Sequence, residues 1–170
     1  ILNRLLIPIG LHHVMNTVIW FQLGSFTDPV SGQIATGDIA RFLAGDPTAG
    51  VYTAGFYPIM MFGLPAACLA MYVCAKKKNK AVVGGMFLLT AIITGITEPI
   101  EFAFMFLSPI LYVIHAILTG ISLAVAYALN VHLAFSFSGG LIDYILYFGK
   151  GQNQLIILLM GLVAFVVYYF

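Results

Sequence analysis

Two glutamates flank a proline within a strongly apolar part of the chain, in the stretch Gly95-Ile96-Thr97-Glu98-Pro99-Ile100-Glu101-Phe102. An ionisable side chain at the centre of a bilayer costs at least about 2.5–3.5 kcal/mol on insertion scales. A proline also leaves a backbone carbonyl without its helical partner, and lipid cannot satisfy that carbonyl. The stretch therefore predicts a buried polar site for a ligand or an ion.

The composition indicates which solvent surrounds the chain. Hydrophobic residues make up 62% of the 170 residues, charged residues make up only 8%, and the mean hydropathy is +1.05. A soluble domain carries about 25% charged residues, because polar groups must cover its surface. We therefore expect an all-α integral membrane protein in contact with membrane lipid. The formal net charge of +1 argues against a nucleic-acid partner.

The two ends of the sequence bear on its completeness. The chain begins at Ile1, without an initiator methionine, and stops within the apolar run from Leu155 to Phe170. We therefore expect it to be part of a longer protein.

Apolar segments predict the first membrane spans. Leu5 to Leu23 is long enough to cross a bilayer if its two histidines are sheltered, and the polar stretch from Ser25 to Gly50 then leaves the membrane core. Val51 to Ala75 is a second span, interrupted at Gly63-Leu64-Pro65. The lysine cluster from Lys76 to Lys80 follows it and marks the cytoplasmic side under the positive-inside rule.

The second half of the chain predicts broken segments as well as spans. Ala81 to Thr97 barely reaches spanning length and is a candidate re-entrant segment. Ile100 to Leu129 is expected to span with a tilt and a kink at Pro109, whereas Val131 to Phe148 is polar enough for a second hairpin or a cavity-lining segment. Residues 1–170 are thus expected to form a single membrane domain, a helical bundle with one or two re-entrant or broken segments.

The residue types near the carboxylates favour a sugar as the solute. A carboxylate such as Glu98 accepts two hydrogen bonds or takes a proton. Donors and a titratable partner are available from Arg4, His12, His13 and Asn16. Because neighbouring residues on a helix lie about 100° apart, at most one of the two adjacent histidines is expected to face the site.

Two aromatic residues and two further histidines allow alternative interpretations. Trp20 and Phe21 either stack on a pyranose ring or anchor a span end at the membrane interface. His115 lies mid-span, where a packing role is favoured over a ligand role, and His132 is ambiguous. Glu101 either contacts the solute directly or supports the site from behind, that is, it holds in place the residues that contact the solute.

A metal centre or a cofactor is not expected. Glu98 and Glu101 could in principle form a metal centre with His115 or His132. The chain, however, has neither a Glu-x-x-His nor a His-x-x-x-His pair, the spacings that metal ligands on a helix commonly have. Cys68 and Cys74 lie in an apolar segment without C-x-x-C spacing, so we interpret both as packing residues.

Four strings carry a family resemblance, and they occur in the order Asn3-Arg4-Leu5-Leu6-Ile7-Pro8-Ile9-Gly10-Leu11-His12-His13, Gly45-Asp46-Pro47-Thr48-Ala49-Gly50, Phe62-Gly63-Leu64-Pro65-Ala66-Ala67 and Gly95-Ile96-Thr97-Glu98-Pro99-Ile100-Glu101-Phe102. They resemble the enzyme IIC membrane component of bacterial phosphoenolpyruvate-dependent sugar phosphotransferase systems, in the glucose superfamily. Two further segments, His13 to Gln22 and Phe135 to Tyr144, look more like the N-acetylglucosamine-specific branch than the glucose or maltose branches.

The resemblance implies a function and a set of site residues. It implies a multi-pass permease of the bacterial cytoplasmic membrane that binds N-acetylglucosamine or glucose and presents its C6 hydroxyl to a phosphocysteine on a IIB domain. Thr97 and Glu98 would hydrogen-bond the sugar at a hairpin tip, with Glu98 polarising or deprotonating the C6 hydroxyl. Arg4 and His12 match family positions near the same site.

The chain departs from the family pattern in two ways, and two alternatives stay open. By the resemblance, we expect it to correspond only to the C-terminal, substrate-binding half of a IIC domain, without the N-terminal half that mediates homodimer formation and without the phosphorylatable cysteine of a IIB domain. A proton-coupled secondary sugar transporter would use Glu98 and a histidine as its relay. A purely structural or docking role would make both carboxylates dispensable and would place function in the Ser25 to Gly50 loop.

Overall fold

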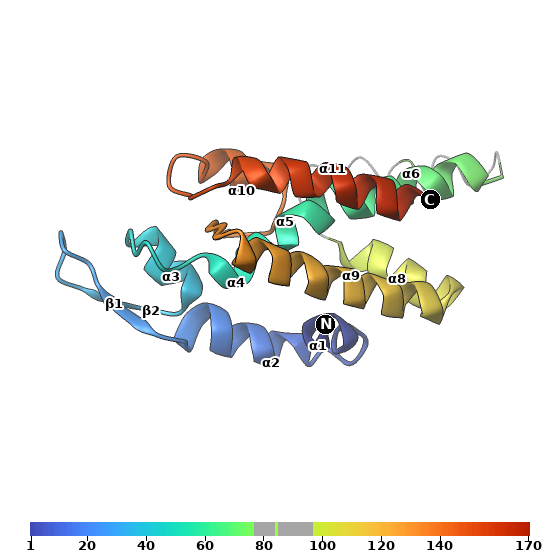
Figure 1. The fold of residues 1–170 in the computed structure, drawn as a ribbon. Helices are drawn as coiled ribbons and strands as arrows, with labels where there is room; N and C mark the ends of the chain where they lie inside the picture. The colour runs from blue at the N-terminus through green and yellow to red at the C-terminus, as the bar shows by residue number, and fades with distance from the viewer. Residues whose placement is uncertain (77–83, 85–96) are drawn as a thin grey trace.

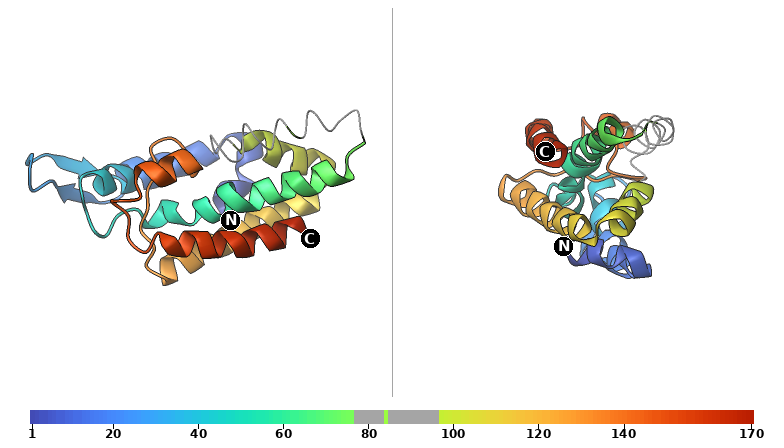
Figure 2. Two further views of the ribbon diagram at one scale, coloured as in Figure 1. Left: turned by 90° about the horizontal axis from the view of Figure 1, so that it is seen from above. Right: turned by 90° about the vertical axis from the view of Figure 1, so that its right-hand side faces the viewer.

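The computed structural model describes residues 1–76, 84 and 97–170 of the chain. Most of the described residues lie in helices that run along one long axis, and a β-hairpin extends from one end (Figure 1). The end-on view in Figure 2 shows the helices gathered into a bundle. The predicted re-entrant segment Ala81 to Thr97 and most of the lysine cluster lie outside the described residues.

The N-terminal region is broken rather than continuous. It consists of α1 (Leu2–Leu5), the 3₁₀ helix η1 (Ile7–Ile9), α2 (His12–Asn16) and the π-helical η2 (Thr17–Gln22). Pro8 lies in the first turn of η1, and Gly10 ends it in the left-handed conformation, with φ of 73°. A left-handed glycine terminates a helix, so the predicted span from Leu5 to Leu23 is not one continuous helix.

The polar stretch after this region contains a small sheet that the all-helical prediction did not include. Strands β1 (Ser25–Thr27) and β2 (Ile34–Thr36) pair antiparallel, with Phe26 opposite Ala35. Asp28 fixes the turn between them, because its carboxylate accepts hydrogen bonds from the Val30 backbone N–H and the Ser31 hydroxyl. The expectation of an all-α fold is therefore corrected at this hairpin, and α3 (Asp38–Leu43) follows it.

The second predicted span agrees with the structure. Helices α4 (Val51–Ala54), α5 (Phe56–Pro58), η3 (Ile59–Gly63) and α6 (Leu64–Cys74) follow one another in a 24-residue segment, Val51–Cys74, that is long and apolar enough to cross a membrane. The predicted interruption at residues 63–65 takes the form of a π-helical turn before Leu64.

The third predicted span is divided into two helices. Helix α8 (Glu98–Leu107) ends before Ser108, and α9 (Pro109–Ala128) begins directly after it. Proline disfavours helical backbone in the residue before it, and Ser108 is extended, with φ of −157°. The chain consequently reverses at Ser108 and α9 packs against α8 (Figure 1), so a single kinked span from Ile100 to Leu129 was wrong. Helix α9 alone is the second membrane-capable helix.

The predicted second broken segment agrees with the structure. Residues 131–140 contain no helix, and the short α10 (Leu141–Leu146) follows. Asp143 fixes the bend before α10, because its Oδ2 atom accepts hydrogen bonds of 2.8 Å from the backbone N–H groups of Phe137 and Ser138. The apolar helix α11 (Leu155–Tyr169) ends the chain and packs against α6 and η3.

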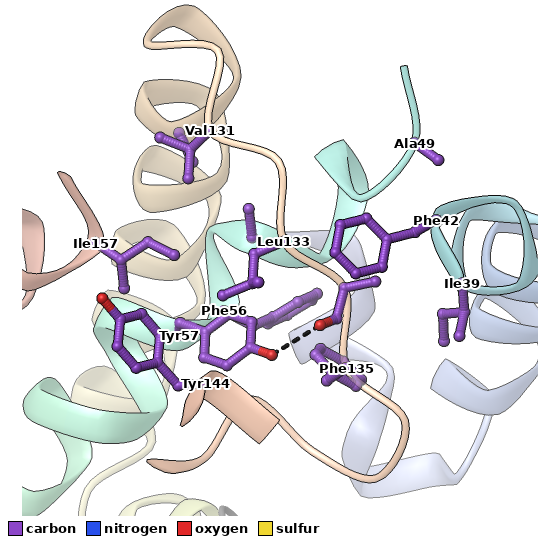
Figure 3. Packing of buried hydrophobic residues seen from close by; sticks show 13 residues of the cluster. Ile39, Phe42, Ala49, Phe56, Tyr57, Val131, Leu133, Phe135, Tyr144 and Ile157 are labelled. Atoms are coloured by element: carbon purple, nitrogen blue, oxygen red, sulfur yellow. Dashed lines mark hydrogen bonds between the residues drawn. The ribbon is translucent and has the colours of Figure 1, made fainter. Parts of the chain in front are cut away.

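The larger hydrophobic cluster joins these elements beneath the broken segment (Figure 3). Tyr57 of α5 lies fully buried among Phe135, Tyr144 and other side chains, and its hydroxyl donates a 2.8 Å hydrogen bond to the Ala134 carbonyl. The non-helical backbone at Leu133 and Ala134 is therefore paired from inside the protein, since the Thr53 hydroxyl likewise donates to the Leu133 carbonyl, as a membrane interior requires.

We predict that replacing Asp38 by alanine destabilises the fold by about 1–3 kcal/mol. The buried Asp38 carboxylate accepts hydrogen bonds from the Gly50 and Tyr52 backbone N–H groups, and these donors would lose their acceptor in the variant. Thermal unfolding of the detergent-solubilised protein measures the loss. Asp28→Ala is the control and should cost less, because water reaches the turn between the strands. Equal losses in the two variants would contradict the prediction.

Candidate functional site

A cavity of about 360 Å³ lies where the broken parts of the chain meet. Its walls come from the N-terminal helices, the start of α8, the α5–η3 region and the non-helical segment before α10. Ligand pockets in proteins have volumes of about 300–1,000 Å³, so the cavity is large enough for a small solute.

All five residues predicted to form the site line this one cavity, namely Arg4, His12, Asn16, Thr97 and Glu98. They come from two regions that are far apart in the sequence. The structure therefore brings the predicted residues together, while their contacts with a sugar stay a prediction.

The two glutamates of the apolar motif have different surroundings. Glu98 begins α8 with an exposed side chain that lines the cavity. Glu101, one turn further on, is fully buried and is not among the cavity residues. Of the two interpretations of Glu101, the structure favours support from behind the site.

A buried ion pair connects Glu101 to Arg4, which lines the cavity. Its Oε1 atom lies 2.7 Å from Nη1 of Arg4 and accepts a 2.7 Å hydrogen bond from the Thr97 hydroxyl. The Nε2 atom of His115 lies 3.6 Å from the same oxygen. The pair joins α1 to the first turn of α8, and so it fixes the distance between Arg4 and Glu98.

Arg4 also has side-chain N–H groups that form no hydrogen bond within the described part of the chain. Its Nε and Nη2 atoms are buried, and neither has a hydrogen-bond partner within the described part of the chain. The guanidinium carbon lies 4.9 Å from the centre of the Phe56 ring, which is a cation–π distance. These two nitrogen atoms carry three N–H donors, which at a cavity with other polar side chains suit an oxygen-rich ligand.

Thr97 is occupied by the protein itself. It is only 3% exposed, its hydroxyl donates to Glu101, and its carbonyl accepts hydrogen bonds from the backbone N–H groups of Ile100 and Glu101. Thr97 thereby orients the start of α8, where Glu98 lies.

Both adjacent histidines line the cavity, so the expectation that at most one would face it was wrong. The two ring centres lie 3.9 Å apart. His12 and His13 are the first two residues of α2, and a separation of about 100° around a helix does not keep both side chains from lining one cavity of this size. The Nδ1 atom of His12 is buried, with no hydrogen-bond partner among the residues described.

One of the two candidate stacking residues reaches the cavity. Trp20 lines it and packs edge-on against Phe135, with ring centres 5.2 Å apart, whereas Phe21 is 53% exposed and lies outside it. The sequence analysis did not select several other residues of the wall: Asn3, Phe56, Phe135, Phe137 and Ser138. Asn3 stands beside Arg4 in one of the segments that carry the family resemblance. Phe135, Phe137 and Ser138 belong to the predicted broken segment, so the sequence contained a signal for these residues but none for Phe56.

The other two histidines and the two cysteines do not line the cavity. His115 packs between Glu101 and Tyr168, whose hydroxyl is 2.7 Å from its Nδ1 atom, and His132 contacts the Ala49 carbonyl through Nδ1. Cys68 is buried and Cys74 is exposed. Within the described residues, no group of three or more His, Cys, Asp or Glu side chains is placed to hold a metal ion.

A cavity with polar side chains, built from broken helices in a bundle with membrane-capable helices, is an arrangement typical of membrane transporters. The family described as Phosphotransferase system, EIIC matches residues 1–120. The chain belongs to this EIIC family, whose members are membrane components of the phosphotransferase system, and the resemblance seen in the sequence is confirmed.

Several curated relatives that match nearly the whole chain are named N-acetylglucosamine-specific components, and a glucosamine-specific EIICBA component of Bacillus subtilis (strain 168) matches at 44% identity. The chain is 59% identical over 174 residues to the N-acetylglucosamine-specific EIICB component of Bacillus subtilis (strain 168), covering 98% of this chain and 37% of the relative. It is 55% identical to the N-acetylglucosamine-specific EIICBA component of Klebsiella pneumoniae, covering 99% and 27%. It is also 55% identical to the N-acetylglucosamine-specific EIIC component of Streptomyces coelicolor, covering 98% and 41%. The chain thus spans less than half the length of each of these relatives.

We predict that Arg4 and Glu101 are energetically coupled. Glu101→Leu leaves the Arg4 charge buried without its counter-ion and should destabilise the protein by about 3–5 kcal/mol. The double variant Arg4→Leu/Glu101→Leu should recover part of that loss, because no uncompensated charge remains. Thermal unfolding in detergent tests this, and a double variant that loses the sum of the two single losses would refute the coupling.

Proposed function

We propose that residues 1–170 form the C-terminal, substrate-binding part of a longer IIC membrane domain. In this proposal the domain binds N-acetylglucosamine, or glucose, during uptake and presents its C6 hydroxyl for phosphorylation. The chain then acts within a protein-phosphohistidine–sugar phosphotransferase, a system in which another domain carries the phosphoryl group.

The observation that carries the proposal is the convergence of Arg4, His12, Asn16 and Glu98 on one cavity. A carboxylate, a guanidinium, an imidazole and an amide together offer the donors and acceptors that a ring of hydroxyl groups requires. Trp20 adds an aromatic wall of the kind that packs on a pyranose face.

The names of the relatives support the substrate and the partner. The relatives above are named N-acetylglucosamine-specific components, and two of them are named EIICB and EIICBA. We infer that this chain works with a phosphorylated IIB domain or subunit, in the bacterial cytoplasmic membrane, as a multi-pass homodimer in contact with lipid. The dimer would form through the N-terminal half of the domain.

In the proposed reaction Glu98 receives the proton of the C6 hydroxyl as the oxygen attacks phosphorus. The P–O bond to the sugar forms, the S–P bond of the phosphocysteine breaks, and the cysteine leaves as a thiolate. Arg4, His12, Asn16 and Thr97 hold the remaining sugar groups or orient Glu98. Such positioning supplies most of the rate enhancement in phosphoryl transfer, because the reacting groups are held in line and do not have to meet by diffusion.

We predict that Glu98→Gln lowers phosphorylation of N-acetylglucosamine by about 100-fold or more, since it removes the proton acceptor while keeping the side-chain shape. The measurement uses membranes that carry the full-length protein and its phosphoryl donors, with labelled N-acetylglucosamine and glucose in competition. Asp28→Asn, in the turn of the β-hairpin, is the matched control and should keep wild-type activity.

Two outcomes would overturn this proposal. Undiminished phosphorylation in Glu98→Gln membranes would remove the role assigned to Glu98. Accumulation of unphosphorylated sugar by the wild type would instead favour a proton-coupled secondary transporter.

A further inference from the structure

Helix α1 carries Arg4 but is too short to hold its own position. It has four residues, Leu2–Leu5, and the chain turns into the 3₁₀ helix η1 soon after it. Isolated helices shorter than about 12 residues are marginal, so tertiary contacts decide where α1 lies. One of its neighbours is α9, against which it packs (Figure 1). The position of Arg4 therefore depends on α9 as well as on Glu101 of α8.

The first contact between α1 and α9 is made by Tyr112. Its hydroxyl donates a hydrogen bond to the backbone carbonyl of Arg4, and its side chain is buried. A helix as short as α1 leaves most of its carbonyls without a partner inside the helix, and lipid offers none. The ring of Tyr112 is anchored independently, because it belongs to a buried cluster that includes Ile100 of α8 and Leu64 of α6. The hydroxyl thus ties the Arg4 backbone to the protein core.

The second contact lies about two turns further along α9, at Gly120. A Cβ atom at this position would come within 2.3 Å of Cγ1 of Ile1, so the absence of a side chain lets the start of α1 approach α9 closely. Positions 112, 116 and 120 are four residues apart and share one face of α9, where Ala116 is fully buried. One face of α9 therefore holds α1 at two points.

These contacts add a restraint that the ion pair does not supply. Glu101 holds the Arg4 side chain through one nitrogen, Nη1, at 2.7 Å. A guanidinium held at one nitrogen can still pivot about that contact, and the pivot would move its Nε and Nη2 atoms. Fixing the Arg4 backbone from α9 removes this freedom. Arg4 lines the cavity, whereas Tyr112 and Gly120 are not among the described residues that do.

We propose that Tyr112 and Gly120 are positioning residues that set where the Arg4 guanidinium lies in the cavity wall, although neither lines the cavity. The inference rests on the proposed function, because it gives these residues an effect on sugar binding through Arg4. The competing explanation is that both residues only stabilise the fold. A stabilising residue changes how much folded protein is present, whereas a positioning residue changes how well each folded molecule binds the sugar.

The test measures KM and kcat for phosphorylation of N-acetylglucosamine in membranes that carry the full-length protein. Size-exclusion chromatography after solubilisation gives the amount of folded protein, so that kcat refers to folded molecules. Tyr112→Phe removes the hydroxyl and keeps the ring in its cluster, and Gly120→Ala adds the Cβ atom that Ile1 would meet. Tyr144→Phe is the matched control, because the Tyr144 hydroxyl also donates to a backbone carbonyl, that of Gln154, and does not line the cavity.

We expect Tyr112→Phe to raise KM by about 5-fold or more with little change in kcat, a factor that the loss of one hydrogen bond can produce. Gly120→Ala should also raise KM, even though alanine favours a helix more than glycine does. Tyr144→Phe should keep the wild-type KM. In an Arg4→Lys background, which keeps the charge but lacks the Nε and Nη2 donors, Tyr112→Phe should change KM by less than about 2-fold.

An unchanged KM in both Tyr112→Phe and Gly120→Ala would overturn the inference, and so would an equal rise in Tyr144→Phe. A rise that Tyr112→Phe produces equally in the wild-type and Arg4→Lys backgrounds would overturn it as well, because the effect would not pass through the guanidinium. A wild type that phosphorylates no N-acetylglucosamine would refute the proposed function instead, so the two failures are distinguishable.

Discussion

The ion pair between Arg4 and Glu101 is the interaction on which the cavity depends. It connects α1 to the start of α8 across a sequence separation of 97 residues, and both side chains are buried. A buried pair of this kind stabilises a protein only weakly compared with an apolar pair, but losing one partner is expensive. Its consequence here is geometric, because it holds Arg4 against the first turn of α8, where Glu98 begins the helix, and both Arg4 and Glu98 line the cavity.

Breaks in the helices create the space that the ion pair organises. Gly10 ends a turn before His12, Ser108 reverses the chain between α8 and α9, and residues 131–140 run without a helix. Each break exposes backbone groups that lipid cannot satisfy, so the protein supplies partners such as Tyr57 and Asp143. The same irregular backbone leaves room for a polar ligand.

The sequence predicted more of the site than of the course of the chain. The five selected site residues line one cavity, because polar groups in an apolar chain have few permissible locations. The span from Ile100 to Leu129 was wrong, since hydropathy does not distinguish a kinked helix from two antiparallel ones. Nor did hydropathy show the β-hairpin, whose strands are only three residues long.

Composition and motifs by themselves determined that this chain belongs in a membrane and which family it belongs to, and they predicted Glu98 as a site residue. Only the tertiary structure decided that Glu101 supports the site from behind, that both His12 and His13 line the cavity, and that Tyr112 donates to the Arg4 carbonyl. The reason is physical. Residue type and local spacing fix what a side chain is able to do, whereas its partners depend on contacts between segments far apart in the chain.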